Sequence, residues 1–281
     1  MRKILVTGCR GYIGQHLIKM LANYPYEVYG IDNVATTYGK NFANLDIMYD
    51  VNEAPWWLSD IPTEFDTIIH LAAKVKVNES VEKPFLYYDT NINGTVNLLQ
   101  RLEFKNFLFA STGAAESCGS PYAVSKRAAE DIVAEYCTKI KSNFINYRFY
   151  NVIGSDGYPP TNPDGLFHNL IQAQHTGVFK LYGDDWDTVD GSCVRDYIHV
   201  NEIAKALING IENPTNQIEN LGTGMGTTVK QMIEIYQEVN NCEFEVQVLP
   251  RRPGDVQSTV LKNVSPLMEK MYNFEDLVKI P

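Results

Sequence analysis

The chain has 281 residues, of which 44% are hydrophobic and 21% are charged, an ordinary balance for a globular protein with a sizeable core. Its formal net charge is −10, which argues against a nucleic-acid partner because such a partner requires a basic face. Five scattered cysteines without a CxxC pair indicate reduced thiols and a cytoplasmic location. The chain contains no apolar run of about 18 residues, so we expect no membrane span.

Short apolar runs alternate with helical patterns in the first half of the chain. The runs are rich in Val, Ile, Leu and Phe and lack polar alternation, as strands buried on both faces do. We predict strands at 3–7, 27–31, 66–71, 106–110 and 144–148, and helices at 12–23, 84–103 and 121–141. Repeated β-α units of this kind predict an α/β fold with a doubly wound parallel sheet of the Rossmann type.

The composition changes after about residue 151. Residues 154–165 are dense in Gly, Pro, Asn and Asp, which is typical of a loop, and further helices are predicted at 166–176, 200–212, 228–240 and 264–271. We predict a Rossmann domain at residues 1–155 and a smaller α/β lobe at residues 156–281. We expect this lobe to bind substrate over the carboxyl ends of the strands, where doubly wound folds bind their ligands.

Three glycines follow the first predicted strand and open the first predicted helix. Gly8 permits a tight turn, Gly11 lets the backbone approach a pyrophosphate at the helix N-terminus, and Gly14 allows close packing of helix and strand. Asp32 ends the next strand, where a carboxylate binds the ribose 2′-hydroxyl of NAD and repels the 2′-phosphate of NADP. The pattern therefore predicts bound NAD. The alternatives are a plain strand–helix turn and, for Asp32, an ordinary turn residue.

Tyr122 and Lys126 are four residues apart on one predicted helix and therefore share a face. Ser120 and Pro121 have the residue types of the N-cap and the first position of that helix. About one such Tyr–Lys pair is expected by chance from the numbers of both residues, so the spacing alone carries no weight. Its location does, because this helix follows the strand that is predicted to end near residue 110.

Ser111 and Thr112 lie at that strand end, and we expect the hydroxyls and the Tyr–Lys face to meet on the nicotinamide side of the cofactor. A phenol with a pKa of ~10 is mostly protonated at pH 7, and a neighbouring ammonium and the positive nicotinamide are expected to lower that pKa. Tyr122 is then a base for a substrate hydroxyl, Lys126 supports the phenolate, and Thr112 donates to the same substrate oxygen.

These segments resemble a known family. Residues 7–14 (TGCRGYIG), 32–33 (DN), 111–112 (ST) and 121–126 (PYAVSK) resemble the extended short-chain dehydrogenase/reductases. Within that family, residues 79–95, 190–200 (DGSCVRDYIHV), 220–224 (NLGTG) and 250–255 (PRRPGD) are similar to segments of the UDP-galactose (UDP-glucose) 4-epimerases. The resemblance runs from residue 1 to about residue 270.

The resemblance implies a fuller set of ligand contacts. Cofactor contacts are expected, beyond the three glycines, Asp32, Tyr122 and Lys126, from Tyr12, Ile13, Asn33, Asp46, Ile47, Leu71, Ala72, Ala73, Asn91, Ser111 and Tyr150. Contacts with the nucleotide sugar are expected from Thr112, Asn151, Asn169, Leu170, Tyr182, Arg195, Arg252, Asp255 and Thr259. Tyr182 would stack on uracil, the two arginines would hold the diphosphate, and Asp255 would bind the ribose.

Arg195 and Thr259 each have a second explanation. From the residues alone, Arg195 is equally well explained as a structural partner of Asp190 or Asp196. Thr259 would border the 2-substituent of the sugar, and a residue this small is expected to admit N-acetyl groups unless it merely lies on a strand and contacts nothing. We expect His70 and His199 to be core or strand-end residues, and we expect no metal site.

The implied activity is epimerisation at C4 of a UDP-hexose by transient oxidation with bound NAD, in a homodimer that pairs through the helices at 84–103 and 121–141. The alternatives are a nucleotide-sugar 4,6-dehydratase and a non-catalytic dinucleotide sensor. A dehydratase normally carries an acidic residue pair directly after the site threonine, where this chain has Gly113 and Ala114. A sensor has no need of the Tyr–Lys pair.

Three features depart from the epimerase pattern. Only residues 113–120 separate Thr112 from Pro121, where the family usually has a longer segment beside the substrate. Val75 occupies the place of a usual lysine, between Lys74 and Lys76, and the tail after residue 270 is short. We therefore expect a more open sugar pocket.

Overall fold

The computed structural model describes residues 1–33, 46–48, 61–160, 162–252, 255–264 and 274–279, with the backbone alone for 46–48 and 274–275. The chain forms two compact units, residues 1–148 with 204–219 and residues 149–203 with 220–281. The sequence-based division at residue 155 did not anticipate that residues 204–219 belong to the first unit. No helix in the described ranges is long and apolar enough to cross a membrane.

One sheet organises the first unit. Its strands within the described residues run in the order β10-β6-β5-β4-β1-β2-β3, and β3, β2, β1, β4 and β5 pair in parallel. Their bounds are β1 Arg2–Thr7, β2 Tyr26–Asp32, β3 Asp46–Met48, β4 Glu64–His70, β5 Glu103–Thr112, β6 Asn143–Phe149 and β10 Gln217–Leu221. This arrangement confirms the predicted doubly wound Rossmann fold.

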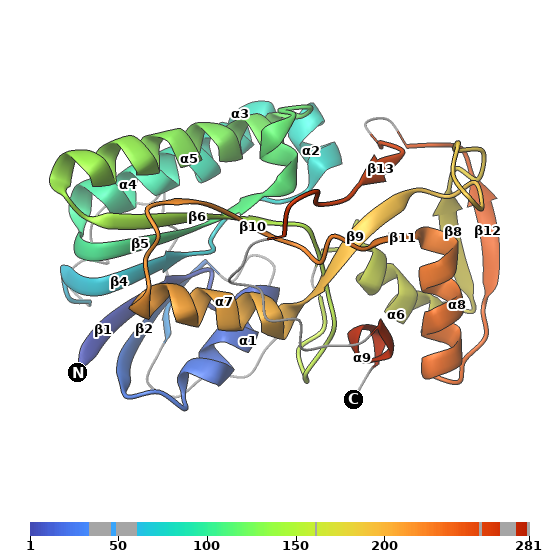
Figure 1. The fold of residues 1–281 in the computed structure, drawn as a ribbon, viewed down its shortest axis with the longest axis horizontal. Coiled ribbons are helices and arrows are strands. Elements are labelled where there is room, and N and C mark those ends of the chain that lie inside the picture. The colour runs from blue at the N-terminus through green and yellow to red at the C-terminus, as the bar shows by residue number, and fades with distance from the viewer. Residues whose placement is uncertain (34–45, 49–60, 161, 253–254, 265–273, 280–281) are drawn as a thin grey trace. The chain divides into compact units, whose positions relative to one another are not determined.

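Helices cover both faces of this sheet. Their bounds are α1 Tyr12–Leu21, α2 Val77–Glu82, α3 Pro84–Tyr88, α4 Gly94–Arg101, α5 Pro121–Ile140 and α7 Val200–Glu212. In Figure 1, α4 and α5 lie over one face, and α1 and α7 lie over the other. Strand residues Ile4, Leu5, Ile68 and Phe107 are fully buried between them, which explains why the strands lack polar alternation.

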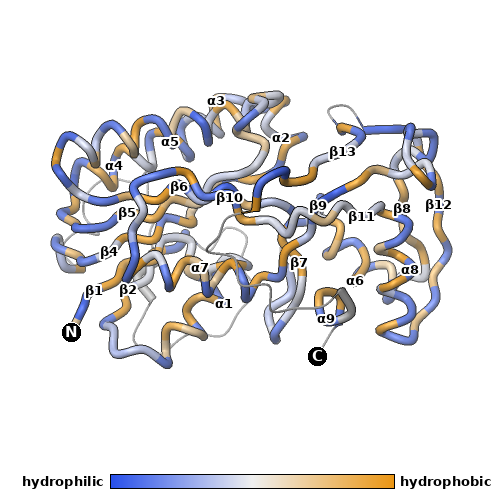
Figure 2. The backbone as a smooth tube through the Cα atoms, viewed as in Figure 1, coloured by the Kyte–Doolittle hydropathy of each residue, from blue (hydrophilic) through white to orange (hydrophobic). Residues whose placement is uncertain are grey.

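The helix that carries the Tyr–Lys pair starts where the sequence predicts. The Ser120 hydroxyl accepts a hydrogen bond from the Ala123 backbone nitrogen at 3.2 Å, Pro121 is the first helical residue, and Lys141 ends α5 in the left-handed conformation. Hydrophilic and hydrophobic residues alternate along α5 (Figure 2), so one side of the helix can pack on the sheet. The cap fixes which residues of α5 face the end of β5.

The helix predicted at 84–103 is wrong as a single element. It is divided into α3, a π-helical segment at Asp89–Asn93, and α4, which ends at Arg101. Glu103 already belongs to β5, where it pairs with Glu64, and the same strand continues through Thr112. Three residues of low helix propensity, at 90, 91 and 93, weaken the middle of the pattern, and the π turn places Asn91 in a buried position.

The second unit is a smaller α/β assembly. Its strands are β7 Asn151–Ile153, β8 Val178–Tyr182, β9 Val194–His199, β11 Gly226–Thr228, β12 Glu245–Leu249 and β13 Ser258–Thr259, and its helices are α6 Leu166–Thr176, α8 Val229–Val239 and α9 Phe274–Val278. Strands β11, β7 and β13 all pair with β9, and β8 pairs in parallel with β12. The helix predicted at 264–271 lies outside the described residues except for Val264, which is not helical.

Candidate functional site

The glycine-rich turn after β1 has no room for a side chain at Gly8 or at Gly14. Gly8 has a φ of 69°, and a Cβ atom there would lie 2.7 Å from the Ala72 backbone nitrogen. A Cβ atom on Gly14 would overlap the carbonyl oxygen of Gly8. The Gly8 nitrogen donates to the Ile31 carbonyl at 2.8 Å, and the Gly11 nitrogen donates to the Gly8 carbonyl at 3.0 Å. The turn is thus a bare backbone cradle at the N-terminus of α1, which fits a dinucleotide pyrophosphate.

Asp32 lies at the end of β2 beside this cradle. Its side chain is 8% exposed, and its Oδ2 atom accepts a hydrogen bond from the Arg10 backbone nitrogen at 2.9 Å. The bond holds the carboxylate against the glycine turn. One carboxylate oxygen therefore connects the turn to β2. This position fits the predicted role of Asp32 in binding the ribose of the cofactor.

The other predicted cofactor residues of the first unit lie at the carboxyl ends of its strands or next to them. Tyr12 and Ile13 form the first turn of α1, Asn33 is exposed after β2, and Leu71, Ala72 and Ala73 follow β4. Asp46 and Ile47 lie in β3, but their side chains are outside the described residues. The sheet therefore brings these positions to one edge, as the βα pattern predicted.

Tyr122 is held by contacts on two sides. Its phenol hydrogen-bonds with the Thr112 side chain, and its ring lies edge-on to the buried ring of Tyr87 with 6.4 Å between centroids. The Nζ atom of Lys126 lies 4.4 Å from the centroid of the Phe109 ring. The structure thus brings Thr112, Tyr122 and Lys126 together at the end of β5, as expected.

The expected effect of Lys126 on the phenol is not present in this structure. Burial raises the pKa of Tyr122 to about 12, and the opposing influence is the hydrogen bond from Thr112. Burial lowers the pKa of Lys126 to about 7, and the charge of Glu130 works against that shift. Desolvation disfavours both charged forms, so it outweighs the mutual support expected from the i,i+4 spacing.

His70, expected to be a core residue, is buried at the end of β4 and joins two threonines. Thr95 donates its hydroxyl hydrogen to the Asn91 carbonyl at 2.7 Å, so at 3.0 Å it accepts from Nε2–H of His70. Nδ1 of His70 then accepts from the Thr7 hydroxyl at 2.6 Å, and Thr7 accepts from the Ala72 nitrogen at 3.2 Å. Burial and the charge of a nearby lysine lower the pKa of His70 to about 3, which agrees with this neutral tautomer.

Asn91 extends the same chain of hydrogen bonds to α5. Its Oδ1 atom accepts from the Lys74 nitrogen at 2.9 Å, and its Nδ2 atom donates to the Lys74 carbonyl at 3.1 Å and to the Ser125 hydroxyl at 2.9 Å. Ser125 in turn donates to the Tyr122 carbonyl at 2.7 Å. Asn91 therefore connects the loop after β4 with the first turns of α5, a support that the sequence did not predict.

Ser111, predicted to contact the cofactor, has a buried partner within the first unit. Its hydroxyl donates to the carboxylate of Glu130 at 2.5 Å, and Glu130 also accepts two hydrogen bonds from Arg148. Sequence reasoning missed the Glu130–Arg148 pair. A charged residue in a buried strand, as Arg148 is, requires a buried partner, and this signal could have indicated that a partner exists.

Three predicted substrate residues of the second unit lie together. The Arg252 guanidinium carbon lies 4.7 Å from the centroid of the Tyr182 ring, and Arg252 Nε donates to Asp255 Oδ2 at 3.0 Å. Next to them, Arg251 stacks on Trp186 at 3.8 Å and donates to Asp185 at 2.7 Å, a contact that sequence reasoning missed. The group combines an aromatic face, a cation and a carboxylate within the second unit.

Arg195 pairs with neither Asp190 nor Asp196, the two carboxylates that could have been its structural partners. It lies in β9 and donates to the Val194 carbonyl at 2.9 Å. The Asp190 carboxylate binds Ser192 and Thr228 instead, and Asp196 accepts from Thr223, Gly224 and Leu261. The alternative of a carboxylate partner at 190 or 196 is therefore wrong. Thr259 in β13 is the register partner of Arg195, which places these two predicted residues side by side.

The remaining predicted substrate residues are engaged within the second unit. The Asn151 amide donates to the Asp196 carbonyl at 3.1 Å, and the Asn169 amide donates to the Pro163 and Gly165 carbonyls at 2.9 Å each. The Leu170 side chain is fully buried in the hydrophobic core, so the expected ligand contact does not hold for that side chain. Tyr150, expected at the cofactor, lies in this unit, and its nitrogen donates to the Leu221 carbonyl at 3.1 Å.

Comparison with known proteins supports the resemblance seen in the sequence. The model of the NAD dependent epimerase/dehydratase family matches residues 4–222. The UDP-glucose 4-epimerase of Caenorhabditis elegans is 33% identical over 91% of this chain and 88% of its own length. The crystal structure of UDP-glucose 4-epimerase from Bifidobacterium longum in complex with NAD+ and UDP is similar with a TM-score of 0.88 and 26% identity, covering 98% of this chain and 96% of that one.

A second solved structure is similar in fold and differs in its named substrate. The UDP-N-acetylglucosamine 4-epimerase from Methanobrevibacter ruminantium, in complex with UDP-N-acetylmuramic acid, has a TM-score of 0.83 and 27% identity. The similarity covers 99% of this chain and 97% of that chain.

Proposed function

We propose that this chain, which belongs to the NAD dependent epimerase/dehydratase family, interconverts the C4 epimers of a UDP-hexose. The observation that carries the proposal is the hydrogen bond between Thr112 and the phenol of Tyr122, with Lys126 one helical turn away. A base with this support suits removal of a proton from a sugar hydroxyl.

The residues that would hold NAD match the needs of a dinucleotide. Gly8 and Gly14 allow the turn to pack tightly against its own backbone at the N-terminus of α1, where a pyrophosphate is favoured, and the carboxylate of Asp32 is positioned beside that turn. Bound NAD supplies the acceptor and donor of hydride at the sugar carbon.

The chain itself supplies acid–base chemistry. Tyr122 takes the proton of the 4-hydroxyl and later returns it, and Thr112 orients the same hydroxyl by hydrogen bonding. Since burial holds the pKa of Tyr122 at about 12, the phenol needs positive charge nearby to act as a base at neutral pH. Lys126 would provide this positive charge once a bound ligand favours the ammonium form of its side chain.

The second unit would hold the nucleotide. Tyr182 offers a ring for the uracil, Arg252 and Arg195 offer guanidinium groups for the diphosphate, and Asp255 offers an acceptor for the ribose. The stacking of Arg252 on Tyr182 and its bond to Asp255 support this assignment, because they order the three side chains in advance.

NMR of the product mixture from UDP-glucose and from UDP-galactose, with NAD present, tests the proposal. Both reactions should approach the same mixture of the two sugars, and mass spectrometry should find no change of mass. Loss of water would indicate a dehydratase, and no reaction with any UDP-hexose would indicate a sensor. The dehydratase is disfavoured because Gly113 and Ala114 begin a short 3-10 turn after Thr112 and the next carboxylate, Glu116, is exposed.

The N-acetylated pair of UDP-hexoses is the second proposed substrate. Thr259 is half-buried and lies opposite Arg195 in the strand pair β9–β13, so it stands beside a residue proposed to bind the diphosphate. A side chain of this size leaves room for a 2-acetamido group. The named substrate of the Methanobrevibacter relative adds support for this extension.

We also propose a homodimer that pairs through α2, α3 and α5. Val81 in α2 is 65% exposed, Phe85 in α3 is 81% exposed and Val124 in α5 is 39% exposed. Helices α2 and α3 both pack against α5. Apolar side chains gathered on adjacent helices are typical of an interface. Phe85→Asp should convert a dimer to a monomer in light scattering at micromolar concentration. A monomeric wild-type protein would refute the proposed dimer.

A cytoplasmic location completes the proposal. The five cysteines are all free, which is typical of proteins in a reducing compartment. Localisation of the tagged protein by fractionation checks it.

A further inference from the structure

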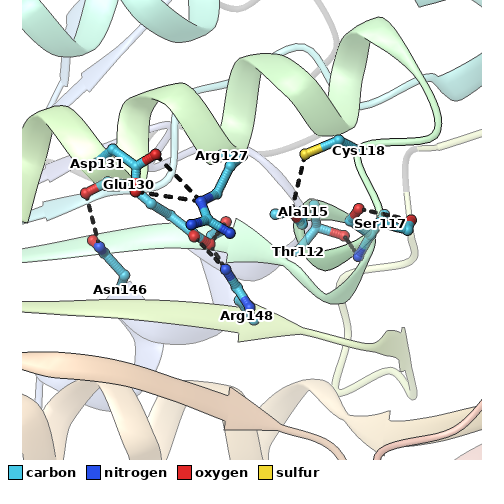
Figure 3. Close-up of polar contacts among 11 residues, drawn as sticks. Thr112, Ala115, Ser117, Cys118, Arg127, Glu130, Asp131, Asn146 and Arg148 are labelled. Carbon is cyan, nitrogen blue, oxygen red and sulfur yellow. Dashed lines mark hydrogen bonds and ion pairs between the residues drawn. The ribbon is translucent and has the colours of Figure 1, made fainter.

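Glu130 is almost completely buried and joins three elements of the first unit (Figure 3). Its carboxylate accepts two parallel hydrogen bonds from Arg148 in β6, at 2.8 Å from Nε and 2.7 Å from Nη2. It also accepts the hydroxyl hydrogen of Ser111 in β5 at 2.5 Å, and its backbone carbonyl accepts from the Asn146 amide at 3.0 Å. Glu130 thereby fixes α5 to the ends of two neighbouring strands.

This fixed point is adjacent to the proposed catalytic residues. Glu130 follows Lys126 by one turn and Tyr122 by two turns of α5, so all three share a face of the helix. Its partner Ser111 directly precedes Thr112, which hydrogen-bonds with Tyr122. A shift of Glu130 would therefore move both the helix that carries the phenol and the strand end that carries its partner.

We propose that Glu130 is a positioning residue of the site, whose carboxylate, held by Arg148 and Ser111, aligns α5 with the end of β5 and stabilises the ammonium form of Lys126. This inference rests on the proposed function. Glu130 contacts neither substrate nor cofactor in the proposal, so it acts through Lys126 and Thr112.

The charges around Lys126 explain why the carboxylate matters. The groups that face it are His70 from β4, Tyr122 and Glu130 from α5, and, through Glu130, Arg148 from β6. His70 and Tyr122 are neutral near pH 7, since their pKa values are about 3 and about 12. Burial alone pulls the pKa of Lys126 down, and Glu130 supplies the negative charge that opposes this. The protonation of Lys126 thus depends on Glu130.

Glu130→Gln tests the proposal because it keeps the shape of the side chain and removes its charge. Asp131→Asn is the matched control, since Asp131 is the next residue of α5 and forms an exposed pair with Arg127 at 3.3 Å (Figure 3). The ionisation midpoint of Lys126 is read by NMR of lysine labelled at Cε, with the signal assigned by its loss in Lys126→Met. We expect Glu130→Gln to lower this midpoint by about one pH unit and Asp131→Asn to leave it unchanged.

The alkaline limb of the pH profile for epimerisation should move in the same direction by about one unit in Glu130→Gln only. A purely structural role would lower protein yield and leave both the midpoint and the pH profile in place, which would overturn the proposal. The NMR reading needs no turnover. Failure of the proposed function, seen as an inactive wild-type enzyme, is therefore distinguishable from failure of the role of Glu130.

Removal of one partner of a buried ion pair leaves the other charge without compensation and can prevent folding. The double variant Glu130→Gln/Arg148→Met removes both charges and replaces the single variant in the NMR measurement if the single variant is insoluble. Its Lys126 midpoint should still lie below that of the wild type, because the carboxylate of Glu130 is absent, but it should fall less than in the single variant, because the positive charge of Arg148 is absent too. An unchanged midpoint in the double variant would also overturn the proposal.

Discussion

The Nζ atom of Lys126 lies 4.4 Å from the centroid of the Phe109 ring, while the phenol of Tyr122 hydrogen-bonds with Thr112. The two side chains thus contact different partners. Lys126 is buried and Tyr122 is half-buried. Burial shifts the pKa of Lys126 down to about 7 and that of Tyr122 up to about 12, so before ligands bind the phenol is protonated at neutral pH and the ammonium carries only part of its charge. We therefore expect bound ligands to activate the pair.

Replacement of Tyr122 by Phe should reduce the rate of epimerisation by about a hundredfold or more while NAD still binds, because only the acid–base group is removed. Stopped NMR assays give the rate, and fluorescence of added NADH gives cofactor binding. Tyr136→Phe is a control on the same helix, where the ring is partly buried and packs against the core. More than a hundredth of the wild-type rate in Tyr122→Phe would contradict the assignment.

Lys126 should make the stability of the protein depend on pH above neutrality. Its pKa is about 7 in the folded protein and about 10.4 in an unfolded chain, so between these values the unfolded state binds more protons. The free energy of unfolding should therefore rise with pH from about 7 to 10, by up to about 1.4 kcal/mol per pH unit from this group.

Urea denaturation of the ligand-free protein at pH 7 and pH 9 measures this slope. Lys126→Met should lose it, and Lys139→Met, a change at an exposed position of α5, should retain it. Equal slopes in all three proteins would show that Lys126 is not desolvated as described.

His70 should produce a second pH dependence on the acid side. Burial and the charge of Lys126 lower the pKa of His70 to about 3, compared with about 6.5 in an unfolded chain. Between these values the unfolded state binds more protons, so stability is lost as pH falls from 6.5 toward 3. His70→Asn should flatten the decrease between pH 6.5 and 5, whereas His175→Asn, at an exposed position on α6, should leave it unchanged. If both variants follow the wild type, the neutral bridge between Thr7 and Thr95 is wrong.

The features that depend on local sequence could be predicted. The glycine turn and the cap at Ser120 are set by residues a few positions apart, so the start of the helix that carries Tyr122 and Lys126 was predicted correctly. The pair of Glu130 and Arg148 could not be predicted in this way, because it joins a helix to a strand by tertiary packing. The same holds for the π turn at Asn91, where buried hydrogen bonds override a helical pattern.

Asp32→Ala should weaken the preference for NAD over NADP. The carboxylate beside the glycine turn would repel a 2′-phosphate, and its removal ends that repulsion together with the bond to the Arg10 nitrogen. Calorimetric titration with both cofactors measures the ratio of the two affinities, which should fall by about tenfold. Asp32→Asn keeps the side-chain shape and separates charge from size. A wild-type protein that binds NADP as tightly as NAD would show that Asp32 does not contact the ribose.

Strand β13 provides a matched pair of positions to test the sugar pocket. Thr259 is half-buried and pairs with Arg195, whereas Ser258 is exposed and pairs with Val194. Successive side chains of a strand point to opposite faces, so a tyrosine at 259 and one at 258 occupy different surroundings on the same backbone. The pair therefore separates a steric effect in the pocket from an effect on the strand itself.

Thr259→Tyr should suppress turnover of the N-acetylated UDP-hexoses by about tenfold or more and largely spare UDP-glucose and UDP-galactose, because exclusion by clash acts only on the larger substrate. Ser258→Tyr should leave both activities close to wild type. The ratio of kcat/KM for the two substrate pairs is the quantity to measure, since a loss of folded enzyme cancels from it. Equal loss on both pairs in Thr259→Tyr, or a wild-type enzyme inactive on the N-acetylated pair, would show that Thr259 does not border the 2-substituent.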